Sequence, residues 1–209
     1  EAVYGTINNT AGTANVANTD AIRCVGLDLQ SGQPVIVRPD KLPSFSSTIG
    51  VGGRRSASAS LRGSVAGSGA AGTAPDWDPV FKAAFGAAVS ISAGVSATYA
   101  LGNAVYGLSL WHFRPVVASG APTQRVGRGC IINSMSISLG NDEPMVECSG
   151  PAAWVIDSTN FASHDTPGKG GLTSFPTQPS SPTYAGNMMP GFLGTITMAS
   201  GTSTLFQTG

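Results

Sequence analysis

Residues 54–64 of the chain decide the fold, and they are RRSASASLRGS. Polar and apolar positions alternate in this stretch, so a β-strand would place them on opposite faces. The polar face would hold Arg54, Ser56, Ser58, Ser60, Arg62 and Ser64, and the apolar face Ala57, Ala59 and Leu61. We therefore expect a strand with one wet, positively charged face and one face on a core.

The same alternation recurs at two other places in the chain. Residues 89–93 alternate Val, Ile and Ala with two serines, and residues 134–139 alternate Ser134, Ser136 and Ser138 with three large apolar side chains. Residues 130–139 and 145–149, joined by a Gly-Asn-Asp-Glu loop, are typical of a β-hairpin. Strands that share a hydroxyl face and an apolar face indicate an antiparallel sheet with one side on a core and the other in water.

One amphipathic helix is predicted at about residues 75–87. Its apolar stripe follows helical spacing, with Pro75 in the first turn and Gly86 near the end. The stripe consists of Trp77, Val80, Phe81, Ala84 and Phe85, and we expect Trp77, Val80, Phe81 and Phe85 to anchor the helix in the core. One helix among many strands predicts a mainly β protein: an antiparallel β-sandwich or barrel with a single α-helix packed on the sheet.

The rest of the chain divides into three parts by composition. Residues 1–20 show little apolar periodicity and are expected to form an N-terminal arm, and residues 21–156 the β-domain. Within it, 21–29 and 34–38 are interpreted as strands joined by a turn at 31–33, 39–51 as a loop, and 104–117 as a strand near the core. Residues 157–209 are interpreted as a Gly/Pro-rich arm with a final strand or hairpin at 192–198 and 205–206, or the start of a second region.

The composition favours self-assembly. The chain has 209 residues, only 11% of them charged, and a net charge of zero at pH 7. A neutral surface gives little repulsion between copies, so we expect much of it to face other subunits. The uncharged stretch from Ala83 to Trp111 is interrupted by Gly, Ser, Thr and Asn and is not expected to span a membrane. No basic-then-apolar leader follows Glu1, so we expect further residues before it and no secretion signal.

No motif in the sequence supports an enzyme, a cofactor or a metal site. Residues 67–72 match GxGxxG, but three residues separate the motif from the helix and the acidic residue of a dinucleotide site is missing. His112 and His164 lack a second histidine at helical spacing, and Asp142-Glu143 fits a solvated hairpin tip. The cysteines Cys24, Cys130 and Cys148 fit no paired framework and are interpreted as small hydrophobes in a reducing compartment.

The basic residues allow two interpretations. Arg54, Arg55 and Arg62 lie on the serine-rich strand, and Arg125 and Arg128 lie in what the sequence suggests is a Gly-rich turn. They could be salt-bridge partners at a subunit interface, or form a weakly cationic surface past which a nucleic-acid backbone slides. The zero net charge argues against tight nucleic-acid binding.

The region around the helix resembles a known family. Residues 63–87, with Gly69-Ala70-Ala71-Gly72-Thr73-Ala74-Pro75-Asp76-Trp77-Asp78 leading into the helix, resemble the tail tube (major tail) proteins of bacteriophages with long, non-contractile tails. Residues 1–6, EAVYGT, resemble the start of those chains. Residues 127–130 through 147–150 resemble their late hairpin. The resemblance covers most of residues 1–154.

The resemblance implies a structural virion protein that assembles in the bacterial host cytoplasm. Stacked, hexameric rings of a β-sandwich-like protomer would form the tail tube, with loops docking on adjacent rings and other tail proteins binding at the tube ends. The hydroxyl-and-arginine face would line the lumen through which DNA passes during ejection. Such a lumen is expected to be electronegative, so either Arg54 and Arg62 pair with carboxylates of a neighbour, or the lumen face belongs to other strands.

Two alternatives remain open at this point. One is another tail protein of the same fold, such as a tail terminator or a distal tail ring. The other is a carbohydrate- or receptor-binding β-domain that uses Tyr106, Trp111 and Tyr184 as stacking platforms.

Overall fold

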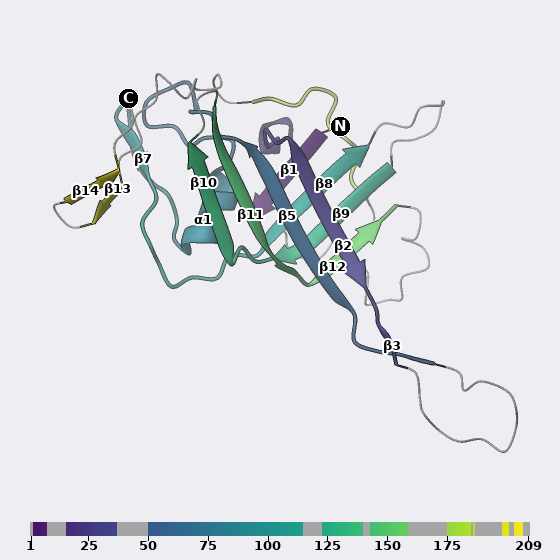
Figure 1. Cartoon of the computed structure of the whole chain (residues 1–209). Helices are drawn as coiled ribbons and strands as arrows, with labels where there is room; N and C mark the ends of the chain where they lie inside the picture. Colours follow the sequence, from purple (N-terminus) through teal and green to yellow (C-terminus); the bar gives the residue numbers. More distant parts are fainter. Residues whose placement is uncertain are drawn as a thin grey trace, which may run out of the picture.

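The fold was analysed in a computed structural model of the chain (Figure 1). It describes residues 2–7, 16–36, 50–114, 123–139, 143–158, 175–184, 186, 198–200 and 203–206. The elements are β1 Ala2–Ile7, the 3₁₀ turn η1 Asn18–Asp20, β2 Gly26–Gly32, β3 Val35–Ile36, β4 Val51–Gly52, β5 Ser56–Ser64, α1 Asp78–Phe85, β6 Ser90–Ser92, β7 Ser96–Thr98, β8 Leu108–Arg114, β9 Thr123–Cys130, β10 Ser134–Leu139, β11 Pro144–Ala152, β12 Trp154–Asp157, β13 Met198–Ser200 and β14 Ser203–Phe206.

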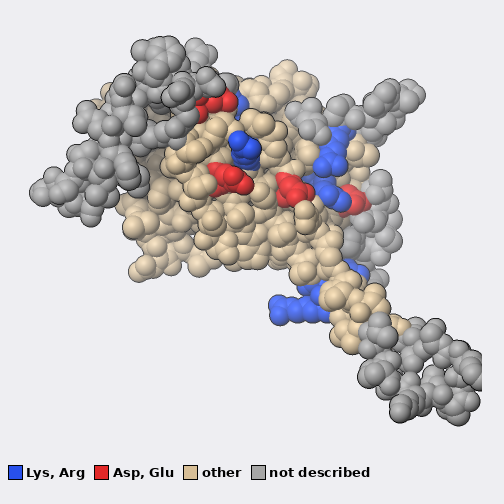
Figure 2. All heavy atoms as spheres, in the orientation of Figure 1, with Lys and Arg blue, Asp and Glu red and all other residues tan. Residues whose placement is uncertain are grey.

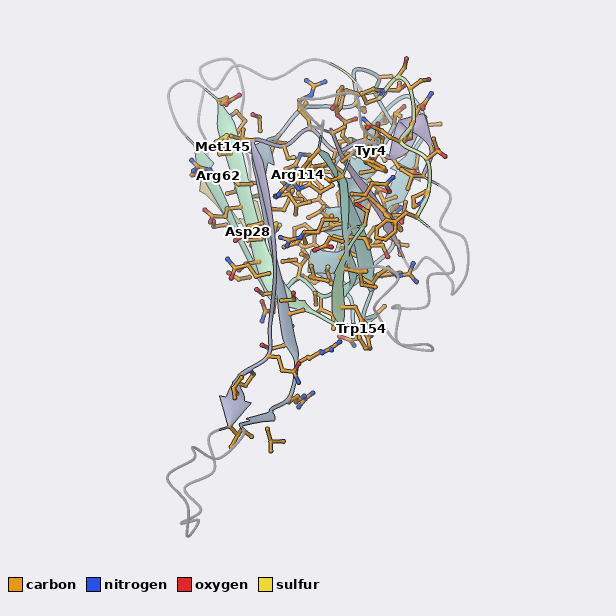
Figure 3. The ribbon with its side chains drawn as sticks, turned by 90° about the vertical axis from the view of Figure 1, so that its right-hand side faces the viewer. Tyr4, Asp28, Arg62, Arg114, Met145 and Trp154 are labelled. Atoms are coloured by element: carbon orange, nitrogen blue, oxygen red, sulfur yellow. The ribbon has the colours of Figure 1, made fainter. Side chains whose placement is uncertain are left out.

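Two four-stranded antiparallel sheets form the body of the molecule. The front sheet in Figure 1 has the strand order β10-β11-β5-β2, and the back sheet has the order β1-β8-β9-β12. The strands of the two sheets cross in that view, and side chains fill the space between the layers (Figure 3). The main core lies there and includes Leu29, Leu61, Leu110 and Val146, all 1% exposed or less. The predicted mainly β, antiparallel fold with one short helix is confirmed.

The front sheet has one buried and one wet face, as the alternation in the sequence requires. In β5, Ala59 and Leu61 are buried while Ser56, Ser58 and Arg62 are exposed. The alternation continues in β11, where Val146 and Cys148 are buried on either side of exposed Glu147. Each apolar side chain is thereby removed from water without burying a charge.

The back sheet is buried on both faces. Six of the seven residues of β8, from Leu108 to Phe113, are buried. Its outer face carries a second apolar cluster that includes Tyr4, Trp111 and Phe113, and the chain itself covers part of this cluster with Val16 and Phe175. The edge of the Phe175 ring faces the Trp111 ring, with centroids 6.5 Å apart. Residues from the region expected to be a C-terminal arm therefore pack on the β-domain.

The helix α1 is shorter than predicted. It begins at Asp78 rather than near 75, because residues 75–78 form a turn closed by the Asp78 N–H to the Pro75 carbonyl, and Trp77 caps it. It ends at Gly86, whose φ of 67° is left-handed. An added Cβ there would lie 2.8 Å from the Ala104 carbonyl oxygen, so the helix stop requires glycine. Trp77 and Val80 are fully buried and Phe85 is half-buried.

Two expectations for the N-terminal third are wrong. Residues 2–7, expected within an arm, form β1 and pair with β8, with Val3 and Tyr4 buried. The expected turn at 31–33 does not join two paired strands, because β2 pairs with β5 and β3 pairs with β4. The chain instead continues from β2 into β3 and returns through β4 to β5, forming an arm that protrudes from the body (Figure 1). Long-range pairing overrode the local turn signal.

Besides the pair β3–β4, two short hairpins lie outside the main sheets in the described part of the chain. The alternation at residues 89–93 forms β6, which pairs only with β7, and Ile91 is 47% exposed, so the expected core face is wrong here. The strands β13 and β14 form a hairpin that includes Met198 and residues 205–206, whereas residues 192–197 of the expected final strand fall outside the described part of the chain. Among the described residues, no helix has the length and apolar character that crossing a bilayer demands.

Candidate functional site: the outer face of the front sheet

The outer face of the front sheet brings the predicted polar positions together. Ser56, Ser58, Ser60 and Arg62 of β5 lie on the same face as Ser134, Ser136 and Ser138 of β10, because β11 between them pairs in register with both strands. The residue pairs Ser60–Ser149 and Ser149–Ser134 mark one row across the three strands. Arg62 and Asp28 point away from the back sheet (Figure 3). The result is a polar surface rich in short hydroxyl side chains, with Met145, Glu147 and Pro151 of β11 between the serines of β10 and β5.

Charged side chains are sparse on this face (Figure 2). Among its strand residues that the structure describes, Arg62 is the only cation, and Asp28 and Glu147 are the carboxylates. Glu147 lies directly opposite Arg62 on the neighbouring strand, and Asp28 lies opposite Ser60, diagonal to Arg62. Oppositely charged cross-strand neighbours stabilise a sheet modestly, by about 0.2–1 kcal/mol. The face therefore carries one more carboxylate than cations, and the carboxylate beside Arg62 comes from the same chain.

The predicted basic cluster does not exist as one surface. Arg54 is exposed but precedes β5, and Arg55 lies at the base of the protruding arm, where its Nε donates to Gln33 Oε1 at 3.3 Å. Arg125 and Arg128 belong to strand β9 of the back sheet, not to a turn. A continuous cationic surface made from all five arginines is thus excluded.

The two arginines of β9 are engaged within their own chain, Arg125 by a hydrogen bond and a carboxylate and Arg128 by burial. Arg125 Nη1 donates to the Leu29 carbonyl at 2.9 Å, which ties the back sheet to β2, and its Nη2 lies 3.8 Å from an Asp157 carboxylate oxygen. Arg128 is 7% exposed, and removal from water lowers the pKa of its guanidinium. Neither side chain contributes charge to the outer face of the front sheet.

Sequence reasoning missed half of the residues on this face. Glu147 and Ser149 alternate with Val146 and Cys148, and Asp28 and Gln30 alternate with Leu27 and Leu29, so the period of two was present in both strands. Which face each strand presents depends on its partner and register, and these pairings join residues as far apart as Ala57 and Ala152. The register aligns Glu147 with Arg62 and Asp28 with Ser60.

Both outer edges of the front sheet lack a paired strand in the described part of the chain. The strand order ends at β10 on one side and at β2 on the other. On β10, Ile137 is 46% exposed although it points toward the core side of the sheet. Open strand edges are templates for pairing with another chain.

The prediction that three aromatic rings form a stacking platform, on which the carbohydrate-binding alternative depends, is wrong. Trp111 is fully buried in the back sheet and packs against Phe175. Tyr106 packs against the main core, and Tyr184 carries the Arg23 guanidinium 5.2 Å from its ring centroid. These three rings do not form a shared exposed surface.

The remaining sequence signals have structural explanations. Cys130 and Cys148 are buried and form no disulfide, which confirms their interpretation as small hydrophobes, and Cys24 is half-buried. In the GxGxxG stretch, Gly69 and Gly72 adopt positive φ angles of 75° and 70° in a turn that ends well before α1 begins. His112 is buried in β8, whereas His164, Asp142 and their expected roles fall outside the described residues.

Comparison with solved structures finds similar chains among tubular assemblies. The chain is similar to the SPP1 tail tube, with a TM-score of 0.43 and 13% identity over 75% of this chain and 76% of that one. It is also similar to a chain of the PVC sheath-tube complex, an extracellular contractile injection system in its extended state. That match has a TM-score of 0.41 and 12% identity over 75% of this chain and 87% of the other. No protein-family model and no curated protein sequence matches the chain.

Both similarities are distant, and they assign no role to this chain or to any of its residues. The first is to a tail tube, which is the kind of protein that the sequence itself resembles. The functional argument for this chain therefore rests on its own surfaces.

Proposed function

We propose that this protein is a non-enzymatic tail tube protein of a bacteriophage virion. Copies would assemble into rings, hexameric as the resemblance implies, and the rings would stack into a tube. In this assembly the outer face of the front sheet lines the lumen, and DNA passes along it during ejection. Other tail proteins would bind the two ends of the tube.

The observation that carries this proposal is the contrast between the two outer faces. The chain covers the outer face of the back sheet with its own residues, including Phe175. The outer face of the front sheet is instead a hydroxyl surface in which Ser56, Ser58 and Ser136 are exposed. The wall of a water-filled tube needs a polar surface toward the lumen and an opposite surface on which the apolar residues are covered.

The open edges of the front sheet support ring formation. If β10 of one copy lies beside β2 of the next, the front sheets join into a continuous barrel with no free edge. The same contact would cover Ile137, whose side chain is 46% exposed in a single copy. Because β10 and β2 are different surfaces, the contact is heterologous, and a heterologous contact closes into rings when the rotation permits.

The composition of the lumen face suits passage rather than binding of DNA. Tight binding to a phosphate backbone depends on many uncompensated Lys and Arg side chains, which release counterions. Here Arg62 is the single cation among the described strand residues of the face, and Glu147 lies opposite it. The position of Glu147 opposite Arg62 supports a lumen in which a carboxylate of the same chain lies beside this cation.

Electron microscopy of the purified protein tests the proposal. We expect hollow filaments of stacked rings at high protein concentration. Single closed rings that never stack would favour a tail terminator or a distal tail ring. A protein that stays monomeric at every concentration would contradict the proposal.

A labelling experiment tests which face lines the lumen. A Ser136→Cys variant should react with a bulky maleimide–polyethylene glycol as a monomer and be protected once filaments form. A Ser180→Cys variant is the control, because Ser180 is exposed in the segment beside the back sheet and should react in both states. Equal labelling of Ser136→Cys before and after assembly would show that another face lines the tube.

A further inference from the structure

Large exposed apolar side chains concentrate in two places. Eleven are exposed in the described residues, and seven of them belong to only two short regions. The hairpin surface is the segment 90–105, with Ile91, Val95, Leu101 and Val105 exposed by 47%, 71%, 86% and 74%. The arm surface consists of Val35, Ile36 and Val51 on β3 and β4, exposed by 66%, 57% and 51%. Gathered apolar surface of this kind marks a contact site.

The hairpin surface is held in place by the helix. The Gly102 N–H donates to the Phe85 carbonyl at 2.9 Å, and the Ala104 N–H donates to the Gly86 carbonyl at 3.0 Å. Tyr99 packs on Phe81 with ring centroids 5.3 Å apart, and its hydroxyl donates to Asp78 Oδ1 at 2.8 Å. The segment is therefore a fixed platform, and it contains no charged residue.

The arm surface has no cover within the described residues of its own chain. The two strands pair through only two residues each, Val35 with Gly52 and Ile36 with Val51. A two-stranded ribbon is marginally stable by itself in water, so contact with a second copy would stabilise it. The described residues of β3 and β4 carry no charge, so burying them would desolvate no ionic group.

The two surfaces lie on opposite sides of the molecule. In Figure 1, β7 lies at the left, beyond β10, and β3 lies on the arm at the lower right. They cannot meet within one copy, but they can meet between two copies. A contact between two different surfaces of identical chains repeats from copy to copy, as a ring or a tube requires.

We propose that the arm surface of one copy docks on the hairpin surface of a second copy, placing Val35, Ile36 and Val51 against Ile91, Val95, Leu101 and Val105. This inference rests on the proposed self-assembly and names a contact within it. The match is between two uncharged, apolar surfaces, each exposed in the single chain. Docking removes both from water, and it fixes the arm in one direction.

A mixed disulfide tests the contact directly. Ile36→Cys protein mixed with Leu101→Cys protein should form a covalent dimer under mild oxidation at pH 8, and neither variant alone should do so. Burial raises the pKa of Cys130 and Cys148 to about 12, so these thiols do not compete at this pH. The unaltered chain, treated in the same way, gives the background from Cys24. Filaments without the mixed disulfide would overturn the inference and leave the proposed function standing.

A charge placed in the contact provides the second measurement. Leu101→Asp should weaken self-association at least tenfold in sedimentation velocity, because the new carboxylate would have to be buried in an apolar contact. The thermal midpoint of the monomer should not change, since Leu101 is 86% exposed. Ser180→Asp is the matched control and should assemble normally. Normal assembly of Leu101→Asp would refute the contact, whereas no assembly of the unaltered chain would refute the tail tube function itself.

Discussion

The two sheets of this protein differ in how they treat their outer faces. The front sheet leaves Ser58 and Ser136 exposed on its outer face, whereas the back sheet buries Trp111 and Phe113 on its own. Both inner faces contribute to one core, which includes Leu61 of the front sheet and Leu110 of the back sheet. The difference lies in what covers the sheet: residues of the chain cover the back sheet, and water or another copy meets the front sheet.

This comparison shows which outer face a single chain covers with its own residues. The chain covers part of the outer face of the back sheet, because Val16 and Phe175 pack on its apolar cluster and the Thr183 N–H donates to the Asn18 carbonyl at 2.8 Å. Among the described residues, the front sheet carries exposed serines on its outer face and ends at β10 and β2. The face that the chain leaves exposed is the one that we propose as the lumen side of the assembly.

The largest expected effect comes from the outer face of the back sheet. Trp111→Ala should lower the free energy of unfolding by about 3–5 kcal/mol, because it leaves a cavity in a fully buried cluster. Denaturant unfolding measures this loss. The matched control is Ser136→Ala on the outer face of the front sheet, which should stay within about 0.5 kcal/mol of the unaltered chain. Similar losses for the two variants would contradict the difference between the faces.

Two glycines on opposite faces of the front sheet sharpen the comparison. A Cβ at Gly63 would lie 2.6 Å from the Arg23 carbonyl oxygen and 2.7 Å from Trp77 Cζ2, so Gly63→Ala should cost about 1–3 kcal/mol of stability. A Cβ at Gly26 meets no atom within 4 Å, and Gly26→Ala should change stability by less than about 0.5 kcal/mol. The free energies of unfolding of both variants, measured by chemical denaturation, test this difference. A costly Gly26→Ala would mean that its face is covered within the monomer.

The cover on the back sheet can be weakened without touching the sheet. Phe175→Ala removes a half-buried ring from Trp111 and should cost about 1–2 kcal/mol. Intrinsic tryptophan fluorescence should also shift to the red, as water reaches the indole. Thr177→Ala, an exposed change in the same segment, should have neither effect. An unchanged spectrum and midpoint for Phe175→Ala would show that the segment does not stabilise the sheet.

The smallest effect at neutral pH is that of the buried thiols, which should destabilise the fold only in alkali. Burial raises the pKa of Cys130 and Cys148 to about 12 from the ordinary 9.0, so the folded state retains protons that the unfolded state releases. Stability from these groups is therefore complete below pH 9 and is lost as the pH rises toward 12. Unfolding midpoints measured at several pH values should fall above pH 9. The Cys130→Ala/Cys148→Ala double variant should show a shallower fall, and an identical slope would refute this origin.

The tyrosines add to the same trend. Burial and the hydrogen bond to Asp78 raise the pKa of Tyr99 well above its usual range, and burial raises the pKa of Tyr4 in the same direction. Some alkaline destabilisation should thus remain in the double cysteine variant.

The sequence predicted the parts of the fold that depend on local periodicity. The alternation in residues 54–64 and 134–139 identified two strands of the front sheet and their hydroxyl face, and the stripe through Trp77 and Phe81 located the helix. Both patterns predicted the structure because, in each element, the apolar face packs on the core and the polar face does not. The same method failed for residues 2–7 and for 90–92, since pairing with distant strands, or the lack of it, decided their burial.

The composition and local pattern of this chain determined that it is a low-charge, mainly β protein with strands of one wet and one apolar face. Only the tertiary structure decided that Glu147 faces Arg62, that Trp111 is covered rather than exposed, and that residues 33–36 and 50–53 form a protruding arm. The physical reason is that side-chain alternation is a property of one strand. Register, the covering of a sheet and the direction of an arm depend on contacts between residues far apart in the chain.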